Sequence, residues 1–184
     1  MSDEQPIANP DPVEPAASDG EERVRALTYG DLPAVLAIER RSFSTPWSLA
    51  MFVLELSKPT GICLALVEDR RLVGYLVCSR YGDVWHLMNV AVTPERRRRR
   101  IATELIERMF DEAGREARFT LEVRTSNRGA IEMYQRFGFR PAGHRRRYYH
   151  DNGEDALIMW MEPMAATSSS STAAVPGESR GVSR

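Results

Sequence analysis

The sequence predicts an α/β domain in which a mixed, mostly antiparallel sheet carries helices on both faces. Two patterns lead to this prediction. Short apolar runs of strand length, bounded by turn residues, alternate with segments in which apolar residues recur at helical spacing. The order along the chain is strand, two helices, three strands, helix, strand, helix and two strands. Helices interspersed among strands in this way cover both faces of one sheet.

The domain begins with a short strand and two helices. The strand is predicted near 24–27. Thr28-Tyr29-Gly30-Asp31 then matches a capping box, and the apolar residues behind it have helical spacing: Leu32, Val35, Leu36 and Ile38. Pro46-Trp47-Ser48 interrupts this helix, and Ser48 can cap a second helix that runs through Leu56.

Three strands follow the second helix. The apolar runs 62–67 and 72–79 are separated by Asp69-Arg70-Arg71, which is typical of a hairpin. A third apolar strand is predicted at 84–92, where Thr93-Pro94 ends it. These three segments should form neighbouring strands of the sheet.

The second half of the domain alternates helices and strands. A long amphipathic helix has its apolar face at Ile101, Leu105, Ile106, Met109 and Phe110. A shorter helix is predicted at 127–137, where Gly138 stops it. The remaining strands are expected at 119–123, 139–149 and 155–162, the last two joined by a turn at Asp151-Asn152-Gly153.

Length and composition fit one domain with tails. The chain has 184 residues, of which 42% are hydrophobic, enough for the core of one domain of ordinary size. Residues 1–23 carry prolines among acids and alanines, and 164–184 contain a serine run, so both are expected to be disordered tails. The domain at 24–163 keeps a mildly basic balance, which suits an anionic small ligand as well as a nucleic acid.

Several classes of protein do not fit this sequence. Cys63 and Cys78 lie in apolar runs, as expected for buried thiols in a reducing compartment, and no Cys/His spacing indicates a metal site. The acidic, proline-rich N-terminus does not look like a signal or transit peptide. No apolar run approaches membrane-spanning length. We therefore expect a cytoplasmic protein without a metal or a membrane.

The most informative stretch runs from Asn89 to Leu105. An apolar strand ends at Pro94, and an arginine-rich turn leads directly into a helix. The free N–H groups of a helix N-terminus suit a pyrophosphate, and arginines add bidentate phosphate contacts. A solvated basic turn beside an ordinary core strand explains the same residues, so the local sequence leaves both interpretations open.

Two residues further along carry possible acid–base chemistry. Glu122 places a carboxylate inside a strand, where a charge is costly unless it is used or paired. Tyr134 lies twelve positions later on the next predicted helix. Acyl transfer to an amine needs a base for the ammonium proton and an acid for the departing thiolate. The alternative is a structural role, with Glu122 paired to Arg124 or Arg140 and Tyr134 a core aromatic, and these residues alone favour it.

Taken together, the motifs resemble the GNAT acetyltransferase superfamily, and most closely its ribosomal-protein alanine N-acetyltransferases (RimI-type). The resemblance covers roughly 24–163. Its motifs are Asp31-Leu32-Pro33, Ile38-Glu39, Phe43, Pro46-Trp47-Ser48, Val90-Ala91-Val92 with Pro94, the arginine turn with Ile101-Ala102, Leu121-Glu122-Val123-Arg124 with Asn127, Ala130 with Tyr134 and Gly138-Phe139, Arg146 with Tyr148-Tyr149, and Glu154-Asp155-Ala156 with Met159.

The resemblance implies a fold, a co-substrate and a set of roles. The co-substrate is acetyl-CoA, and the acceptor is the N-terminal alanine of small-subunit ribosomal protein 18. Glu122 resembles the general base and Tyr134 the general acid, with His86 as a rival base. The coenzyme contacts would be Val90, Ala91, Val92, Arg97, Arg98, Arg99, Arg100, Ile101, Ala102, Thr103, Asn127 and Tyr134. The acceptor would lie against Trp47, Tyr148 and Tyr149.

One departure from the family's pattern concerns the arginine turn. The family usually has glycine where this chain has Arg100, and often at Arg98 as well. Three alternatives therefore stay open: an acetyltransferase of broader specificity for protein N-termini or small amines, a silent coenzyme-binding protein, and a module that holds ribosomal RNA through Arg96–Arg100 and Arg145–Arg147. No stacking platform accompanies these arginines, so we expect no direct nucleic-acid contact.

Overall fold

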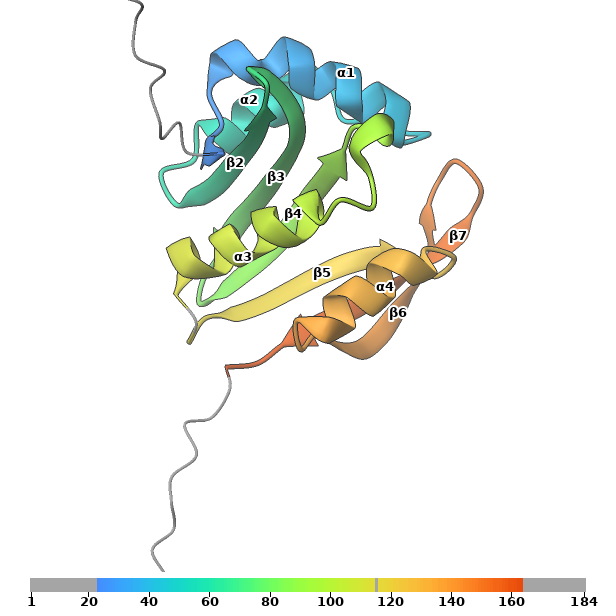
Figure 1. The fold of residues 1–184 in the computed structure, drawn as a ribbon. Coiled ribbons are helices and arrows are strands. Elements are labelled where there is room, and N and C mark those ends of the chain that lie inside the picture. The colour runs from blue at the N-terminus through green and yellow to red at the C-terminus, as the bar shows by residue number, and fades with distance from the viewer. Residues whose placement is uncertain (1–22, 115, 164–184) are drawn as a thin grey trace, which may run out of the picture.

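A computed structural model describes residues 23–114 and 116–163, and over this part the chain forms one seven-stranded sheet with four α-helices (Figure 1). The helices are α1 (Leu32–Ser42), α2 (Leu49–Leu56), α3 (Ile101–Ala113) and α4 (Arg128–Arg136). The strands are β1 (Val24–Ala26), β2 (Gly61–Glu68), β3 (Arg71–Tyr81), β4 (Val84–Val92), β5 (Arg118–Arg124), β6 (Arg140–Tyr149) and β7 (Glu154–Met161). Apart from Arg23, the tails predicted at 1–23 and 164–184 lie outside the described residues.

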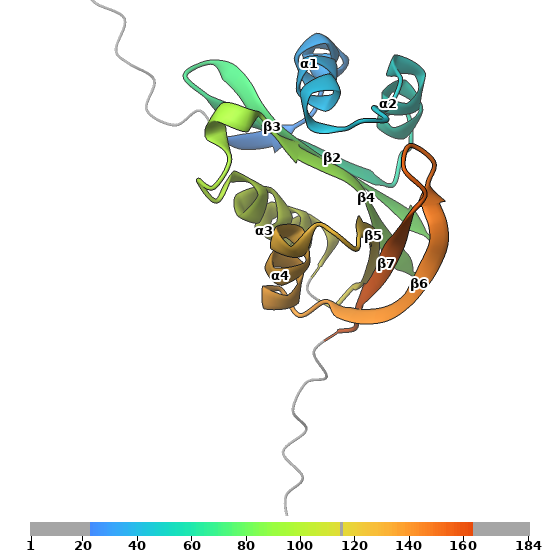
Figure 2. The ribbon, with the colours of Figure 1, turned by 90° about the vertical axis from the view of Figure 1, so that its right-hand side faces the viewer.

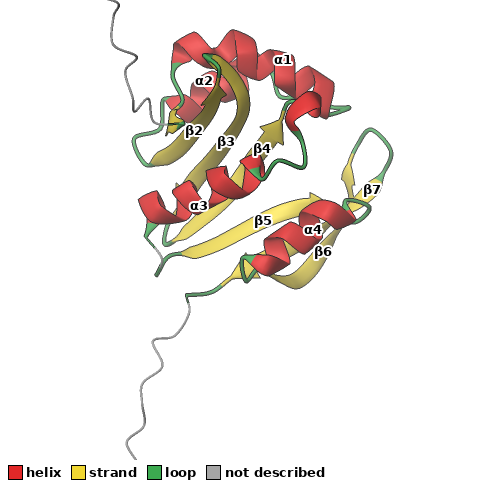
Figure 3. Ribbon diagram, viewed as in Figure 1, coloured by secondary structure: helices red, strands yellow, loops and turns green. Residues whose placement is uncertain are grey.

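The architecture confirms the predicted fold class. The strand order is β1-β2-β3-β4-β5-β7-β6, and all neighbours are antiparallel except β4 and β5, which are parallel. The helices α1 and α2 cover one face, and α3 and α4 cover the other (Figure 2). The order of helices and strands is the one that the sequence predicts (Figure 3).

Local signals in the sequence explain most element boundaries. The Ser48 side chain accepts a hydrogen bond from the Met51 N–H and so caps α2, while Asn127 caps α4 by accepting one from the Ala130 N–H. The β2–β3 turn is shorter than predicted, because Arg71 already belongs to β3. Asp69 and Arg70 make this turn with φ of 50° and 60°, the left-handed conformation of tight hairpins.

A core packs on each face of the sheet. On one side, α3 and α4 cover residues such as Leu64, Leu76, Phe119 and Leu121, and on the other, α1 and α2 cover Val77 and its neighbours. Gly74 lies under α3, where an added Cβ would approach Ile101 Cγ2 to 2.9 Å. The missing side chain therefore lets the N-terminus of α3 approach the sheet closely at the end of β4.

The parallel strands β4 and β5 pair only over their first halves. Val84–Leu87 lies beside Arg118–Leu121, and the ladder ends there. Opposite β3, Cys78 faces Leu87 and Val77 faces Asn89, so Met88 forms a β-bulge. Beyond this bulge β4 continues on β3 alone, and the strands diverge (Figure 1). Residues 89–92 of β4 and 122–124 of β5 therefore face the opening between the two strands.

No helix within the described part of the chain is long and apolar enough to cross a bilayer. Cys63 and Cys78 are free thiols, half-buried and buried respectively.

Candidate active site

Glu122 lies where the two parallel strands separate. Its neighbours Leu121 and Val123 point into the core beneath α3 and α4, so the alternation of β5 turns Glu122 toward the opposite face. Its side chain is only 8% exposed and has two basic partners. Oε2 lies 2.5 Å from His86 Nε2, and Oε1 lies 3.2 Å from Arg145 Nη2. The pairing with Arg124 or Arg140 that the sequence suggested is therefore wrong, because β6 returns along β7 and presents Arg145 instead.

The environment of Glu122 favours its charged form. The hydrogen bond from His86 lowers the pKa of the carboxyl group most, burial opposes this effect, and the charges of His86 and Arg145 lower it further. Glu122 is therefore ionised at neutral pH, as a proton acceptor must be. A lowered pKa also makes the carboxylate a weaker base.

His86 reaches Glu122 from β4, one strand away. The sequence left His86 and Glu122 as rival bases, whereas the structure joins them in one hydrogen-bonded pair. A proton taken up by this pair can be shared between the imidazole and the carboxylate, which offsets the weakness of the carboxylate as a base. Sequence reasoning missed Arg145 as a partner of Glu122, although its basic run was visible as a possible nucleic-acid contact.

Tyr134 lies on α4 and is almost fully buried. Its ring packs edge-on against Phe139 with centroids 5.8 Å apart. Burial raises the pKa of the phenol, and the neighbouring Tyr149 raises it further. The hydroxyl forms no hydrogen bond with any other residue that the structure describes, and none joins it to Glu122. Tyr134 is thus a core aromatic by packing, with a protonated hydroxyl that is free to act as a donor.

Tyr149 connects the surroundings of Glu122 and Tyr134. Its phenol is influenced electrostatically by Glu122, and it in turn influences Tyr134. Burial is the main reason that its pKa rises to about 12. The Arg124 guanidinium lies 3.8 Å from the centre of its ring, and the Tyr148 ring packs edge-on at 5.2 Å. Tyr148 and Tyr149, predicted to contact the acceptor, therefore lie beside the Glu122 pair.

Trp47 is placed differently from the two tyrosines. Its ring is half-buried and packs against Phe52 at 5.2 Å, within the core under α1 and α2. The α1–α2 loop still reaches the β6–β7 turn through another residue, because Ser44 donates a hydrogen bond to Asp151. Arg124 holds the same Asp151 carboxylate with contacts of 2.9 and 2.8 Å. The loop and the turn are thus joined on the face that carries Glu122.

Part of the backbone of β4 is free on the side where β5 diverges. The Thr93 N–H donates to Val73 O, which fixes the alternation of the β3–β4 ladder. By this alternation the N–H and C=O groups of Val90 and Val92 point away from β3. Arg97 Nε donates to Val92 O at 3.1 Å, as expected for that direction. The Val90 N–H therefore faces the opening and can donate to a ligand there.

The arginine turn leads into an uncapped helix. No side chain caps the N-terminus of α3, in contrast to α2 and α4, so the first N–H groups of α3 keep their capacity for a ligand. Arg98, Arg99 and Arg100 are exposed beside it. Arg97 is committed to the protein, since its Nη2 also donates to Ser42 Oγ at 3.0 Å. The turn and the helix end can together bind an anion such as a pyrophosphate.

Two arginines of this turn have the backbone conformation of glycine. Arg98 and Arg100 both have φ of 64°, in the left-handed region that costs an L-residue about 1–2 kcal/mol. This explains why relatives of the resembled family carry glycine there. We attributed that preference to close approach of the phosphate alone, and the positive φ adds a second reason.

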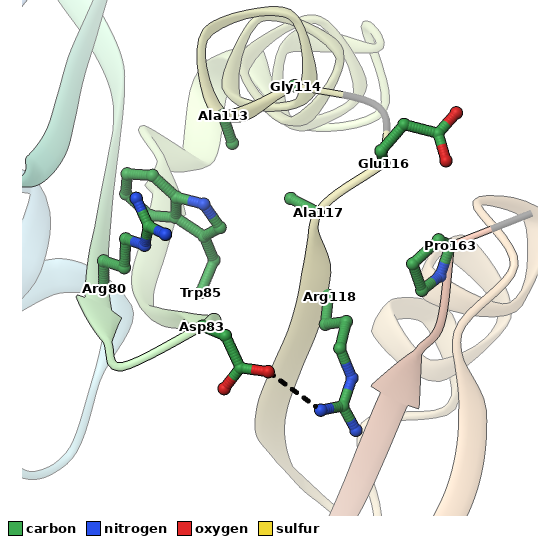
Figure 4. Close-up of a pocket in the computed structure, with 9 residues that line it drawn as sticks. All are labelled: Arg80, Asp83, Trp85, Ala113, Gly114, Glu116, Ala117, Arg118 and Pro163. Carbon is green, nitrogen blue, oxygen red and sulfur yellow. Dashed lines mark hydrogen bonds and ion pairs between the residues drawn. The ribbon is translucent and has the colours of Figure 1, made fainter.

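The hollows of the surface lie elsewhere. A pocket between the end of α3 and the start of β5 is lined by Trp85, Ala117 and Arg118, with Arg118 bound to Asp83 at its rim (Figure 4). A second lies beside the β2–β3 turn. Neither is lined by Glu122 or Tyr134. Among the described residues, no group of His, Cys, Asp and Glu is arranged to hold a metal ion.

Comparison with known proteins identifies relatives over this whole region. The sequence model of the acetyltransferase (GNAT) family matches residues 32–139. A Bacillus subtilis relative is 39% identical over 143 residues, which cover 75% of this chain and 93% of the relative. The ribosomal protein bS18-alanine N-acetyltransferase of Escherichia coli K12 is 34% identical, covering 74% and 94%. The crystal structure of the E. coli ribosomal-protein-S18-alanine N-acetyltransferase superposes with a TM-score of 0.71 at 32% identity, covering 79% of this chain and 96% of that one.

Proposed function

Since the chain belongs to the acetyltransferase (GNAT) family and is an acetyl-transferring enzyme, we propose that it acetylates the N-terminal alanine of ribosomal protein bS18 in the cytoplasm, with acetyl-CoA as donor. The substrate is suggested by the E. coli relative, whose name states this reaction. The observation that carries the proposal is the Glu122–His86 pair, held at the point where β4 and β5 diverge. An ionised carboxylate and an imidazole there can accept the proton of an incoming amine.

The acyl donor would bind along β4 and the start of α3. The pyrophosphate fits the uncapped N–H groups of Ile101, Ala102 and Thr103 together with the guanidinium groups of Arg98–Arg100. The pantetheine would run along Val90–Val92. Asn127 uses its carbonyl oxygen to cap α4, which leaves its amide group to donate to the coenzyme. The acceptor would enter on the opposite side, beside Tyr148 and Tyr149.

The reaction needs two proton transfers around one nucleophilic attack. Glu122 and His86 take the proton from the N-terminal ammonium group, and the neutral amine attacks the thioester carbonyl. The Val90 N–H is placed to stabilise the oxyanion of the tetrahedral intermediate. When this intermediate collapses, the C–S bond breaks and Tyr134 protonates the departing thiolate.

The proposed function is tested with synthetic peptides. We expect the protein to transfer acetyl from acetyl-CoA to a peptide with the first residues of bS18, and mass spectrometry should place the acetyl group on the α-amine. The same peptide with a blocked N-terminus is the control. Equal turnover on serine-, methionine- and alanine-starting peptides would favour the broader specificity. Calorimetric binding of acetyl-CoA without any turnover would favour a silent coenzyme-binding protein.

Replacing Arg100 by glycine should affect stability more than coenzyme binding. The change removes a left-handed arginine, which relieves about 1–2 kcal/mol of strain, and the freedom of glycine in the unfolded chain offsets part of this gain. One exposed phosphate contact is lost in exchange. We therefore expect a higher melting temperature and less than about a tenfold change in acetyl-CoA affinity. Thermal unfolding and calorimetry measure the two effects.

Two further variants control for the Arg100 result. Arg70→Gly relieves the same kind of strain, with φ of 60° in the β2–β3 turn, and should leave the coenzyme affinity unchanged. Replacing Arg98 and Arg99 together by alanine should weaken binding more than Arg100→Gly does, and more at low salt than at high salt. A large gain in affinity for Arg100→Gly would mean that the native turn is a damaged phosphate site.

The pKa of Glu122 should depend more on His86 than on Arg145. The hydrogen bond from His86 is the main cause that lowers this pKa from its ordinary value of 4.5, and the charge of Arg145 contributes least. We expect His86→Ala to raise the pKa of Glu122 clearly and Arg145→Ala to raise it less. A ¹³C NMR titration of the side-chain carboxyl group measures both, and a larger rise in Arg145→Ala would contradict this account.

The lowered pKa also fixes the sign of a stability effect. Because the folded state holds Glu122 ionised more firmly than the unfolded chain does, the pair stabilises the fold at pH values above about 4.5. This contribution is lost as the pH falls through the lower, folded pKa. The unfolding free energy of His86→Ala should therefore depend less on pH in this acidic range.

A further inference from the structure

One buried carboxylate is not explained by the acid–base chemistry. Glu39, in the last turn of α1, is 1% exposed. No Lys, Arg or His of the described chain forms an ion pair with it. A buried carboxylate without a cation is costly unless several donors surround it. The other buried glutamate, Glu55 on α2, has such a cation, because Lys58 Nζ contacts its oxygens at 2.7 and 2.8 Å.

Three neutral groups hold Glu39 instead of a cation. Oε1 accepts from the backbone N–H of Trp47 at 2.8 Å, and the Tyr75 hydroxyl donates to Oε2. The Asn89 amide lies 3.2 and 3.3 Å from the two oxygens. Tyr75 and Asn89 are themselves buried. The polar cluster therefore fixes its members in one arrangement, because any donor left unpaired there loses its hydrogen bond without gaining water.

The cluster connects the two sides of the proposed reaction. Asn89 follows the β-bulge at Met88 and directly precedes Val90, whose N–H faces the proposed acetyl site. Trp47 lies in the α1–α2 loop, which also contacts the β6–β7 turn through Ser44. Glu39 is bonded to both segments at once. It thereby sets the position of the acceptor side relative to the strand that carries the acyl donor.

We propose that Glu39 is a positioning residue for the acceptor peptide, which holds the α1–α2 loop on β4 so that the incoming amine meets the acetyl group. This inference rests on the proposed function. It concerns a residue that touches neither substrate and acts through Trp47 and Asn89. Loss of the carboxylate should therefore impair use of the peptide, while binding of acetyl-CoA, which uses α3 and the arginine turn, should change little.

The choice of variants follows from the donors around Glu39. Glu39→Leu leaves the Trp47 N–H and the Asn89 amide without an acceptor. Glu39→Gln keeps one carbonyl oxygen for Trp47, and its amide group can donate to the Tyr75 hydroxyl, which is able to accept. Glutamine should therefore rescue most of the effect. Glu55→Leu is the matched control, since it removes a buried glutamate from the same layer of helices without touching β4 or the α1–α2 loop.

Steady-state kinetics with the full chain test this proposal. In Glu39→Leu we expect the KM for the peptide to rise about tenfold or more, equivalent to about 1.4 kcal/mol, with the KM for acetyl-CoA within about twofold of the native value. In Glu39→Gln and Tyr75→Phe, which keep the bond to Trp47, the peptide KM should stay within about threefold. Glu55→Leu should lower the melting temperature comparably and leave both KM values unchanged.

Several outcomes would overturn the proposal. If Glu39→Leu melts earlier but keeps its peptide KM, or if both KM values rise together, Glu39 only stabilises the fold. If that variant does not fold, a peptide KM that is the same in Glu39→Gln, Tyr75→Phe and their double variant at reduced Trp47 amide protection leads to the same conclusion. The acceptor is the best peptide of the alanine, serine and methionine series. Failure of the bS18 peptide alone therefore rejects the proposed substrate and not the role of Glu39.

Discussion

Replacing Glu122 by glutamine is expected to lower turnover by about a hundredfold or more while acetyl-CoA still binds with its native affinity. The amide has nearly the same shape, and its carbonyl oxygen can still accept from Arg145, but it cannot take up the ammonium proton. The coenzyme contacts lie on β4 and α3, so the change does not reach them. Stopped turnover with unchanged calorimetric binding of acetyl-CoA is the expected result.

The hydrogen bond between Glu122 and His86 makes the comparison of single and double variants informative. If the two act as one unit, Glu122→Gln, His86→Ala and the double variant should be impaired to a similar degree, because groups that act together lose their effect together. Undiminished turnover in Glu122→Gln, together with an inactive His86→Ala, would assign the base to His86. Multiplied losses in the double variant would show that the two groups act independently.

Replacing Tyr134 by phenylalanine is expected to cost about a hundredfold in turnover at nearly native stability. The ring keeps its contact with Phe139, and the hydroxyl has no hydrogen bond to lose among the described residues. Burial raises the pKa of the phenol, so that it remains protonated across the neutral range and can protonate the thiolate. Only the proton donor disappears in this variant. Turnover and thermal unfolding are measured side by side.

The matched control for Tyr134 is Phe139→Leu. This change removes the same ring contact from the other side and costs stability, since Phe139 is buried in the core, but it leaves the Tyr134 hydroxyl in place. We expect it to melt earlier and to retain turnover below its melting range. If Tyr134→Phe instead melts early and turns over normally, Tyr134 is a core aromatic without a role in the reaction.

The sequence by itself determined the elements and their order, because the signals for them are local. Helical spacing from Leu32 and from Ile101, the caps Ser48 and Asn127, and the break at Pro46 each act within a few residues. These signals also set the place of Glu122 in a strand and of the arginine turn before a helix. Together with the resemblance in motifs, they were sufficient for the fold class and for the family, both of which are confirmed.

Only the tertiary structure decided which side chains meet. The Glu122–His86 contact spans two parallel strands separated by α3, and Arg145 arrives because β6 returns along β7 at the edge of the sheet. Glu39 and Asn89 are 50 residues apart, and Ser44 and Asp151 are 107 apart. Strand periodicity tells which face a residue takes but not which residue lies beside it, since strand order and register depend on packing of the whole sheet. The divergence of β4 and β5 and the left-handed Arg100 likewise follow from how the sheet and α3 pack together, and no local pattern in the sequence announces them.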